Sequence, residues 1–178
     1  MDGVAEILLR RGEAEDAETL FAIHRESAMA AYVHVFPPDR YEFPDEEMRR
    51  HWIEALSDPE TEVVIGERRG RAVGFATVSS GWLRNLFVVP GEWGHGVAPA
   101  IHDEAIERLR EHGPMAQLWV LEANERARTF YERRGWRHDG ERATSEFPPF
   151  PPTLRYTLEL REPSAGAPIP IPHPPQGM

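Results

Sequence analysis

The chain has 178 residues, 40% of them hydrophobic, a length and composition that fit one compact domain. All 20 basic residues are arginines, and against 30 acidic residues they leave a formal net charge of −10. This balance argues against a protein that binds duplex nucleic acid, and the absence of lysine and cysteine excludes Schiff-base chemistry, thiolate metal sites and a cysteine nucleophile.

The first half of the chain alternates between strand and helix patterns. Apolar residues at every third or fourth position are typical of one helix face, and alternating β-branched residues are typical of strands. They predict a strand at 4–11 and a helix that begins at Ala17 and fades near Tyr32. A second helix at 44–56 and a hairpin of two strands at 62–67 and 71–79 follow. Residues 36–43, between the helices, are rich in aromatics and prolines; such loops often line ligand sites, but simple helix packing explains the aromatics equally well.

The second half of the chain continues the alternation. A nearly continuous apolar strand at 82–89 is expected to be central in the sheet. A helix at 94–112, a strand at 117–121, a helix at 124–134 and an antiparallel pair at 136–145 and 153–160 follow. The resulting order, βααβββαβαββ, predicts an α/β (α+β) fold.

The composition changes after residue 161. The last seventeen residues hold six prolines and two glycines, which predicts a proline-rich tail at 162–178 behind a single domain at 1–161. No apolar run reaches the length of a membrane span, and the short, mixed, charged start does not resemble a signal peptide. We therefore expect a soluble, cytoplasmic protein that does not associate with membranes.

The most informative segment is a glycine-rich turn after the central strand. Gly94 and Gly96 allow the backbone to approach an anion closely, and the free amides of the following helix start favour negative charge. This pattern points to phosphate or pyrophosphate binding. Taken alone, the glycine spacing is explained better by a tight strand–helix turn than by phosphate binding. The dinucleotide pattern GxGxxG is also absent.

Two motifs resemble the GNAT superfamily of N-acetyltransferases. Trp93-Gly94-His95-Gly96-Val97-Ala98 resembles its motif (Gln/Arg)-x-x-Gly-x-(Gly/Ala), with Trp93 in place of Gln or Arg, which removes one charged contact to phosphate. Residues 124–136 resemble its later motif N-x-x-A-x-x-F-Y-E-x-x-G-(F/W). The resemblance covers residues 7–160 and implies a mixed, mostly antiparallel, splayed sheet of about seven strands flanked by four helices.

The resemblance also implies the reaction and its residues. The family transfers an acetyl group from acetyl-CoA to an amine by direct attack in a ternary complex, with no metal. Tyr131 would protonate the departing thiolate, a task for which a slightly lowered pKa would suit its phenol. An amide near Val88 would stabilise the oxyanion. The coenzyme-binding residues implied by position are Leu86, Phe87, Val88, Trp93, Gly94, His95, Gly96, Val97, Ala98, Asn124, Ala127, Arg128 and Tyr131.

Charge patterning adds hypotheses about both substrates. Residues 124–137 hold five arginines against two glutamates, so Arg128 or Arg133 could reach a ribose phosphate. Residues 41–60 hold seven acids against two arginines, which would draw a cationic amine to that side. The residues that we expect to contact the amine are Tyr32, His34, Phe36, Asp39, Trp52 and Arg84.

The general base is not evident from any motif. Glu122, at the end of its strand, is the first candidate, and His34, Asp39 and Glu42 are alternatives. His24 lies on an apolar helix stripe and is expected to be a core residue. The histidines have no metal-binding spacing, so we expect no metal.

The leading prediction is therefore an enzyme that acetylates a primary amine of a small molecule. The alternatives are acetylation of a protein N-terminus or side chain, and a non-catalytic acyl-CoA-binding module. Dimers are common in the family that the chain resembles, so the resemblance suggests a homodimer. The exclusive use of arginine points to a GC-rich bacterial genome.

Overall fold

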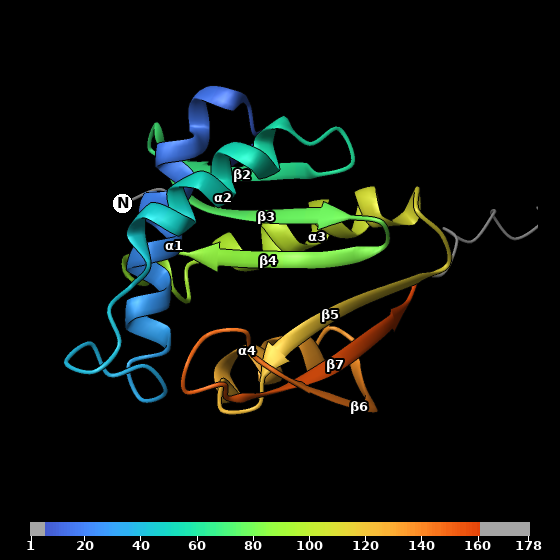
Figure 1. Cartoon of the computed structure of the whole chain (residues 1–178). Helices are drawn as coiled ribbons and strands as arrows, with labels where there is room; N and C mark the ends of the chain where they lie inside the picture. The colour runs from blue at the N-terminus through green and yellow to red at the C-terminus, as the bar shows by residue number, and fades with distance from the viewer. Residues whose placement is uncertain (1–5, 161–178) are drawn as a thin grey trace, which may run out of the picture.

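A single seven-stranded sheet runs through residues 6–160, the part of the chain that the computed structural model describes (Figure 1). Its strands lie in the order β1-β2-β3-β4-β5-β7-β6. Neighbouring strands are antiparallel except for β4 and β5, which are parallel. The strands are β1 (Ile7–Arg11), β2 (Glu62–Arg68), β3 (Arg71–Ser79), β4 (Trp82–Val88), β5 (Met115–Leu121), β6 (Arg137–Thr144) and β7 (Pro152–Glu159).

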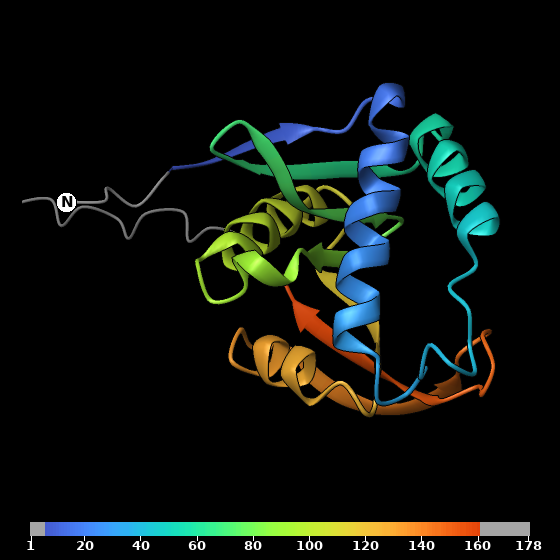
Figure 2. The same cartoon turned by 90° about the vertical axis from the view of Figure 1, so that its left-hand side faces the viewer.

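Four helices cover the two faces of this sheet. Figure 2 shows α1 and α2 on one side and α3 and α4 on the other. Short 3-10 turns precede α1 and α3, at η1 (Ala14–Asp16) and η2 (Pro90–Glu92). The helices are α1 (Ala17–Ala31), α2 (Asp45–Ser57), α3 (Val97–Arg110) and α4 (Glu125–Glu132).

Alternating side chains of the central strands feed two separate cores. On one face, Val64 packs with Ile101 and Leu109 of α3; on the other, Ile65 packs with Leu20 and Trp52 of α1 and α2. Such an alternation follows from the two-residue period of a strand. Gly74 permits the close approach of α3, because a Cβ there would lie 2.9 Å from Ile101 Cδ1 and 2.8 Å from the Phe87 carbonyl oxygen.

The sheet opens between its two parallel strands. β4 and β5 pair only at Trp82 and Gln117, near the start of each strand, whereas every other pair of neighbours is in register over five or more residues. Beyond that point the two strands diverge (Figure 1). The backbone groups along the inner edge of β4 are therefore available to a ligand.

The predicted fold, element order and splayed sheet are confirmed, with shifts at element ends. The helix expected from Gly94 begins at Val97, because Gly94 and Gly96 adopt left-handed conformations with φ of 79° and 84°. The strand expected at 117–121 begins at Met115. Residue 4, where the first strand was expected to begin, and the proline-rich tail lie outside the described residues.

Candidate active site

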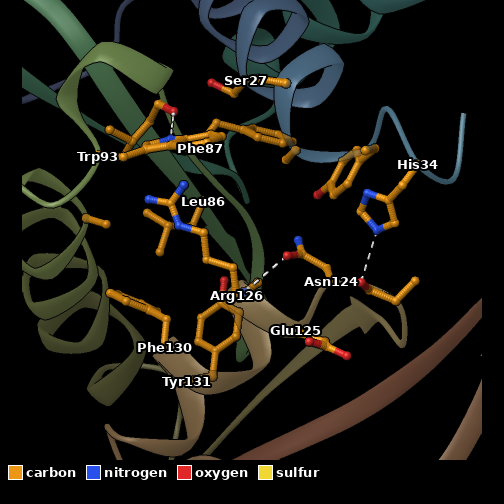
Figure 3. A pocket seen from close by; sticks show the side chains of 17 residues that line it. Ser27, His34, Leu86, Phe87, Trp93, Asn124, Glu125, Arg126, Phe130 and Tyr131 are labelled. Atoms are coloured by element: carbon orange, nitrogen blue, oxygen red, sulfur yellow. Dashed lines mark hydrogen bonds between the residues drawn. The ribbon is translucent and has the colours of Figure 1, made fainter. Parts of the chain in front are cut away.

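A cavity of about 590 Å³ lies where β4 and β5 part (Figure 3). The end of β4 and the turn before α3 form one wall, the second half of α1 and the segment after it form another, and α4 closes the third. In Figure 3, Arg126, Phe130 and Tyr131 project from α4, and Trp93, Phe87 and Ser27 lie across the cavity from Tyr131. Three segments that are distant in sequence thus meet at one place.

The glycine turn beside this cavity presents unpaired backbone amides. Within residues 6–160, no backbone carbonyl accepts the N–H groups of Gly94, Gly96, Val97 or Ala98. The first amides of a helix have no intrahelical acceptor, and the positive end of the helix dipole lies there. A Cβ at Gly94 would meet nothing within 4 Å, so the turn is open to solvent. This arrangement favours a phosphate group.

The end of β4 points alternate backbone groups into the cleft. The amide of Val89 donates to the Val73 carbonyl of β3 at 2.9 Å. Since successive residues of a strand point their backbone groups to opposite edges, the N–H and carbonyl of Val88 face the cleft. The carbonyl accepts the Trp93 indole N–H at 2.7 Å, which fixes the ring over the end of the strand. The Val88 N–H remains as a donor directed into the cleft.

Arg126 places a positive charge over the same ring. Its guanidinium carbon lies 3.7 Å from the centroid of the Trp93 ring, a cation–π contact between α4 and the turn. Although the residue as a whole is exposed, burial of the guanidinium lowers its pKa. No carboxylate of the described residues forms a salt bridge with it. A partly desolvated, unpaired cation therefore lies beside the open amides.

Burial affects two further polar groups in the cavity, the hydroxyls of Ser27 and Tyr131. The Ser27 hydroxyl of α1 is buried and has no hydrogen-bond partner among the described residues. Tyr131, 8% exposed, has its pKa raised well above the usual range, first by burial and then by the neighbouring Tyr32. The lowered pKa that would suit a proton donor to a thiolate is thus not found, because the cavity wall disfavours phenolate. Tyr131 keeps its proton across the physiological range.

Asn124 organises the entrance to α4. Its side-chain oxygen accepts the Ala127 amide at 3.1 Å, the hydrogen bond of a helix N-cap. The Asn124 side chain also forms a hydrogen bond with Tyr32. This bond opposes the rise in the pKa of Tyr32 that burial causes. His34 bonds the Ala123 carbonyl through Nε2 at 3.1 Å. Because a carbonyl only accepts, Nε2 carries the proton and Nδ1 is left as an acceptor.

A second cavity of about 610 Å³ adjoins the first, and Tyr32 lines both. The loop between α1 and α2 contributes the largest share of its wall, and the β6–β7 loop contributes Ser145, Phe147 and Pro148. The two cavities thus share one side chain of their walls. The wall of the second cavity is largely apolar and aromatic, with three charged residues: Arg40, Glu42 and Glu47.

His24 lies in the wall of this second cavity as a neutral group. Its Nδ1 accepts the Trp52 indole N–H at 3.3 Å, and its ring stacks on Phe87 with centroids 4.3 Å apart. Burial lowers the pKa of His24 to about 4, with a smaller effect from His51. It is thus a packed histidine, as expected, and it also borders a cavity.

Most of the predicted site residues come together here. The first cavity is lined by ten of them: Tyr32, His34, Leu86, Phe87, Val88, Trp93, Ala98, Asn124, Ala127 and Tyr131. Phe36 lines the second cavity. Gly94, His95, Gly96 and Val97 form the turn beside the first.

Five predicted residues lie outside both cavities and outside the glycine turn. Trp52 is fully buried in the core, and Asp39 and Arg84 are exposed elsewhere. The carboxylate of Glu122 binds Arg142 at 2.8 Å, and Arg128 donates to the Tyr156 hydroxyl at 3.2 Å and to the Glu122 carbonyl. These contacts direct both side chains away from the site, so we do not place them in it.

Some residues of the site were missed. Ser27 could have been noticed as a polar residue on the apolar face of its helix, and Arg126 as a cation in the first turn after Asn124. Phe147 and Pro148 carry no local signal, since only the β6–β7 connection brings them to the second cavity.

The acidic segment is only partly directed at the site. Of the seven acids at 41–60, Glu42 and Glu47 line the second cavity. Asp45 pairs with Arg25, and Asp58 bonds the Thr61 hydroxyl and the Glu60 amide. In residues 6–160, no cluster of three or more potential ligands for a metal ion is found, and none of the helices has the length and apolar character of a membrane span.

Comparison with known proteins yields one family. The model of the "Acetyltransferase (GNAT) family" matches residues 9–136. An uncharacterized N-acetyltransferase of Archaeoglobus fulgidus is 26% identical over 135 residues, 69% of this chain and 88% of that protein. One of Mycobacterium tuberculosis is 30% identical over 98 residues, 51% of this chain and 62% of its own length.

Solved structures share the fold. An N-acetyltransferase from Staphylococcus aureus superposes with a TM-score of 0.69 at 19% identity, covering 88% of this chain and all of its own. The PaiA N-acetyltransferase from Thermoplasma acidophilum, solved in complex with coenzyme A, has a TM-score of 0.63 at 17% identity and covers 84% of this chain and 98% of its own.

Proposed function

The chain belongs to the GNAT family of acetyltransferases, and on that premise we propose that its two cavities, which share Tyr32, bind acetyl-CoA and a primary amine of a small molecule. One observation carries the proposal: three features meet at the first cavity. They are the amides of the glycine turn without an acceptor in residues 6–160, the Val88 amide that faces the cleft, and Tyr131, which burial keeps protonated. The second cavity shares Tyr32 with the first, and we propose that the amine binds there.

The residues of the first cavity fit the coenzyme. The open amides of Gly94, Gly96, Val97 and Ala98, and Arg126, which has no carboxylate partner within residues 6–160, suit a diphosphate, because charge-assisted hydrogen bonds are the strongest available to it. The buried Ser27 hydroxyl has no partner in the described part of the chain, and such a group costs about 1–3 kcal/mol unless a ligand satisfies it. The apolar wall of Leu86 and Phe87 suits the pantetheine arm.

The same residues supply the chemistry of acetyl transfer. Bound acetyl-CoA would provide a thioester as the acetyl donor. The Val88 N–H would donate to the thioester oxygen as negative charge develops there, the role of a preorganised oxyanion donor. Tyr131, kept protonated by burial, would donate to the sulfur as the thiolate departs. Its raised pKa makes hydrogen-bond donation to the sulfur its main contribution.

A base for the amine is proposed among the candidates that line the cavities. His34 lines the first cavity with Nδ1 as an acceptor, whereas Glu122 is held by Arg142. Glu42 lines the second cavity and not the first, where Val88 and Tyr131 lie. We therefore assign proton acceptance to His34.

Thiol release in the presence of acetyl-CoA and a panel of amines tests the proposal, with the product identified by mass spectrometry. We expect coenzyme A and an N-acetylated small amine in equal amounts, and a strongly reduced rate in the Tyr131→Phe variant. Preferential acetylation of peptides would favour a protein acetyltransferase instead. Binding of coenzyme A without transfer to any amine would favour a non-catalytic acyl-CoA-binding module.

A further inference from the structure

We infer that the amine acceptor carries its single primary amine on an aromatic or apolar stem, and this inference rests on the proposed function. The second cavity has a volume of about 610 Å³ and shares Tyr32 as a lining residue with the coenzyme cavity. An amine that reacts in the first cavity beside Tyr32 would place the rest of the acceptor in the second. The side chains there set its chemistry.

Aromatic and apolar side chains form most of this cavity. The ring of Phe36 lies edge-on to both Tyr32 and Tyr41, with centroids 6.3 Å apart in each case. Phe43, Met48 and Phe147 complete the wall. Edge-on aromatic pairs leave ring faces available for a further ring or alkyl chain. Such a wall gains free energy by removing apolar surface from water and offers little to a hydroxylated or polycationic stem.

The histidine in the wall adds no charge. His24 keeps a pKa of about 4 because it is buried, and its Nδ1 already accepts the Trp52 indole N–H at 3.3 Å. Its remaining ring nitrogen, Nε2, is therefore a neutral donor. A second ammonium group on the molecule to be acetylated would find no hydrogen-bond acceptor on His24.

The three charged lining residues are exposed and lie at the solvent side. Glu42 and Glu47 outnumber Arg40, so the entrance carries a net negative charge. This charge attracts a cationic amine and disfavours a stem that bears a carboxylate, such as an amino acid. The negative entrance thus disfavours an amino acid, the apolar wall disfavours a polyamine, and the acceptor is a monoamine.

The reaction on such an acceptor balances without a further reactant. The ammonium first loses one proton, and the amine nitrogen then forms a bond to the acetyl carbon while the carbon–sulfur bond breaks. The second proton leaves the nitrogen as the thiolate gains one to become the thiol. One proton per turnover is released to solvent.

An acceptor panel tests the inference at saturating acetyl-CoA, with kcat/KM obtained from thiol release. We expect 2-phenylethylamine and hexylamine to exceed ethanolamine, spermidine and phenylalanine by about thirtyfold or more, as burial of a ring or alkyl chain implies. Calorimetric titration of 2-phenylethylamine into protein saturated with coenzyme A provides a readout independent of turnover. There we expect binding of 2-phenylethylamine and none of ethanolamine.

Two pairs of variants separate this cavity from its surroundings. Phe147 and Phe150 lie in one loop and are both exposed, but only Phe147 lines the cavity. Phe147→Ala is expected to raise the KM for 2-phenylethylamine about fivefold, and Phe150→Ala to leave it unchanged. Glu47→Gln should raise the same KM more at low salt than at high salt, whereas Glu46→Gln, on the same helical turn but outside the cavity, should not.

The outcomes distinguish the inference from the proposed function. Preferred turnover of spermidine, phenylalanine or a peptide would overturn the inference and leave acetyl transfer intact. Equal effects of Phe147→Ala and Phe150→Ala would also overturn it. Absence of both coenzyme A binding and thiol release in folded protein would refute the proposed function itself, and the inference with it.

Discussion

Replacing Arg126 by glutamine is expected to weaken acetyl-CoA binding about tenfold. The guanidinium lies 3.7 Å over the Trp93 ring, beside the open amides of the glycine turn, and no carboxylate among the described residues pairs with it. A charge-assisted hydrogen bond to a phosphate is worth about 1.5–3 kcal/mol. Moving the guanidinium from the ring costs about 0.5–1 kcal/mol. The difference, about 1–2 kcal/mol, corresponds to about tenfold in Kd.

The assay is a calorimetric titration of acetyl-CoA at two salt concentrations. The Kd of the unaltered protein should rise more steeply with salt than that of the Arg126→Gln variant, because the variant has lost one cation–phosphate contact. Arg137→Gln is the matched control, since Arg137 is an exposed arginine at the start of β6 and lies outside the cavity. Equal Kd values and equal salt dependence for Arg126→Gln and the unaltered protein would refute the assignment.

Three further perturbations test other parts of the account. Tyr131→Phe should lower kcat about 100-fold with the Kd for acetyl-CoA unchanged, as measured by thiol release and calorimetry; an unchanged kcat would remove Tyr131 from the mechanism. The pKa of His24 is about 4 in the folded chain against 6.5 in the unfolded one. Between those values the unfolded chain binds a proton that the folded chain does not, so stability falls as pH drops. Urea unfolding at pH 7 and pH 4.5 should therefore show a loss of about 2–3 kcal/mol that shrinks in His24→Gln, and an equal loss in both proteins would argue against this origin. Gly96→Ala places a side chain at φ of 84°, at a cost of about 1–2 kcal/mol, and should weaken acetyl-CoA binding. Gly113→Ala, at φ of 136° and away from the cavity, should lower the melting temperature without changing that binding.

Local pattern was sufficient to predict the elements and to bring most of the motif residues to the first cavity and the turn beside it. The glycines at 94 and 96 and the asparagine at 124 each act within a few residues of their own position, through backbone conformation or a helix cap. Those effects depend on neighbours in sequence, so their local conformations could be predicted without knowledge of tertiary contacts. The exact start of α3 differed because the left-handed glycines delay the helix by three residues.

Tertiary contacts explain why some predicted site residues lie elsewhere in the structure. Glu122 lies at the end of its strand as expected, but Arg142 from β6 captures its carboxylate. Arg128 turns to the Tyr156 hydroxyl of β7 for the same kind of reason. The wall of the second cavity combines the α1–α2 loop with Phe147 from more than one hundred residues later. No periodicity in the sequence encodes a contact between two loops so far apart.

A calorimetric titration of acetyl-CoA into the full chain, with coenzyme A and ATP as controls, tests the central claim most directly. The account predicts one molecule bound per chain with a micromolar Kd, competition by coenzyme A, and much weaker binding of ATP. Protein that is folded by circular dichroism but binds neither acetyl-CoA nor coenzyme A would contradict it, because the glycine turn and Arg126 would then not form a diphosphate site.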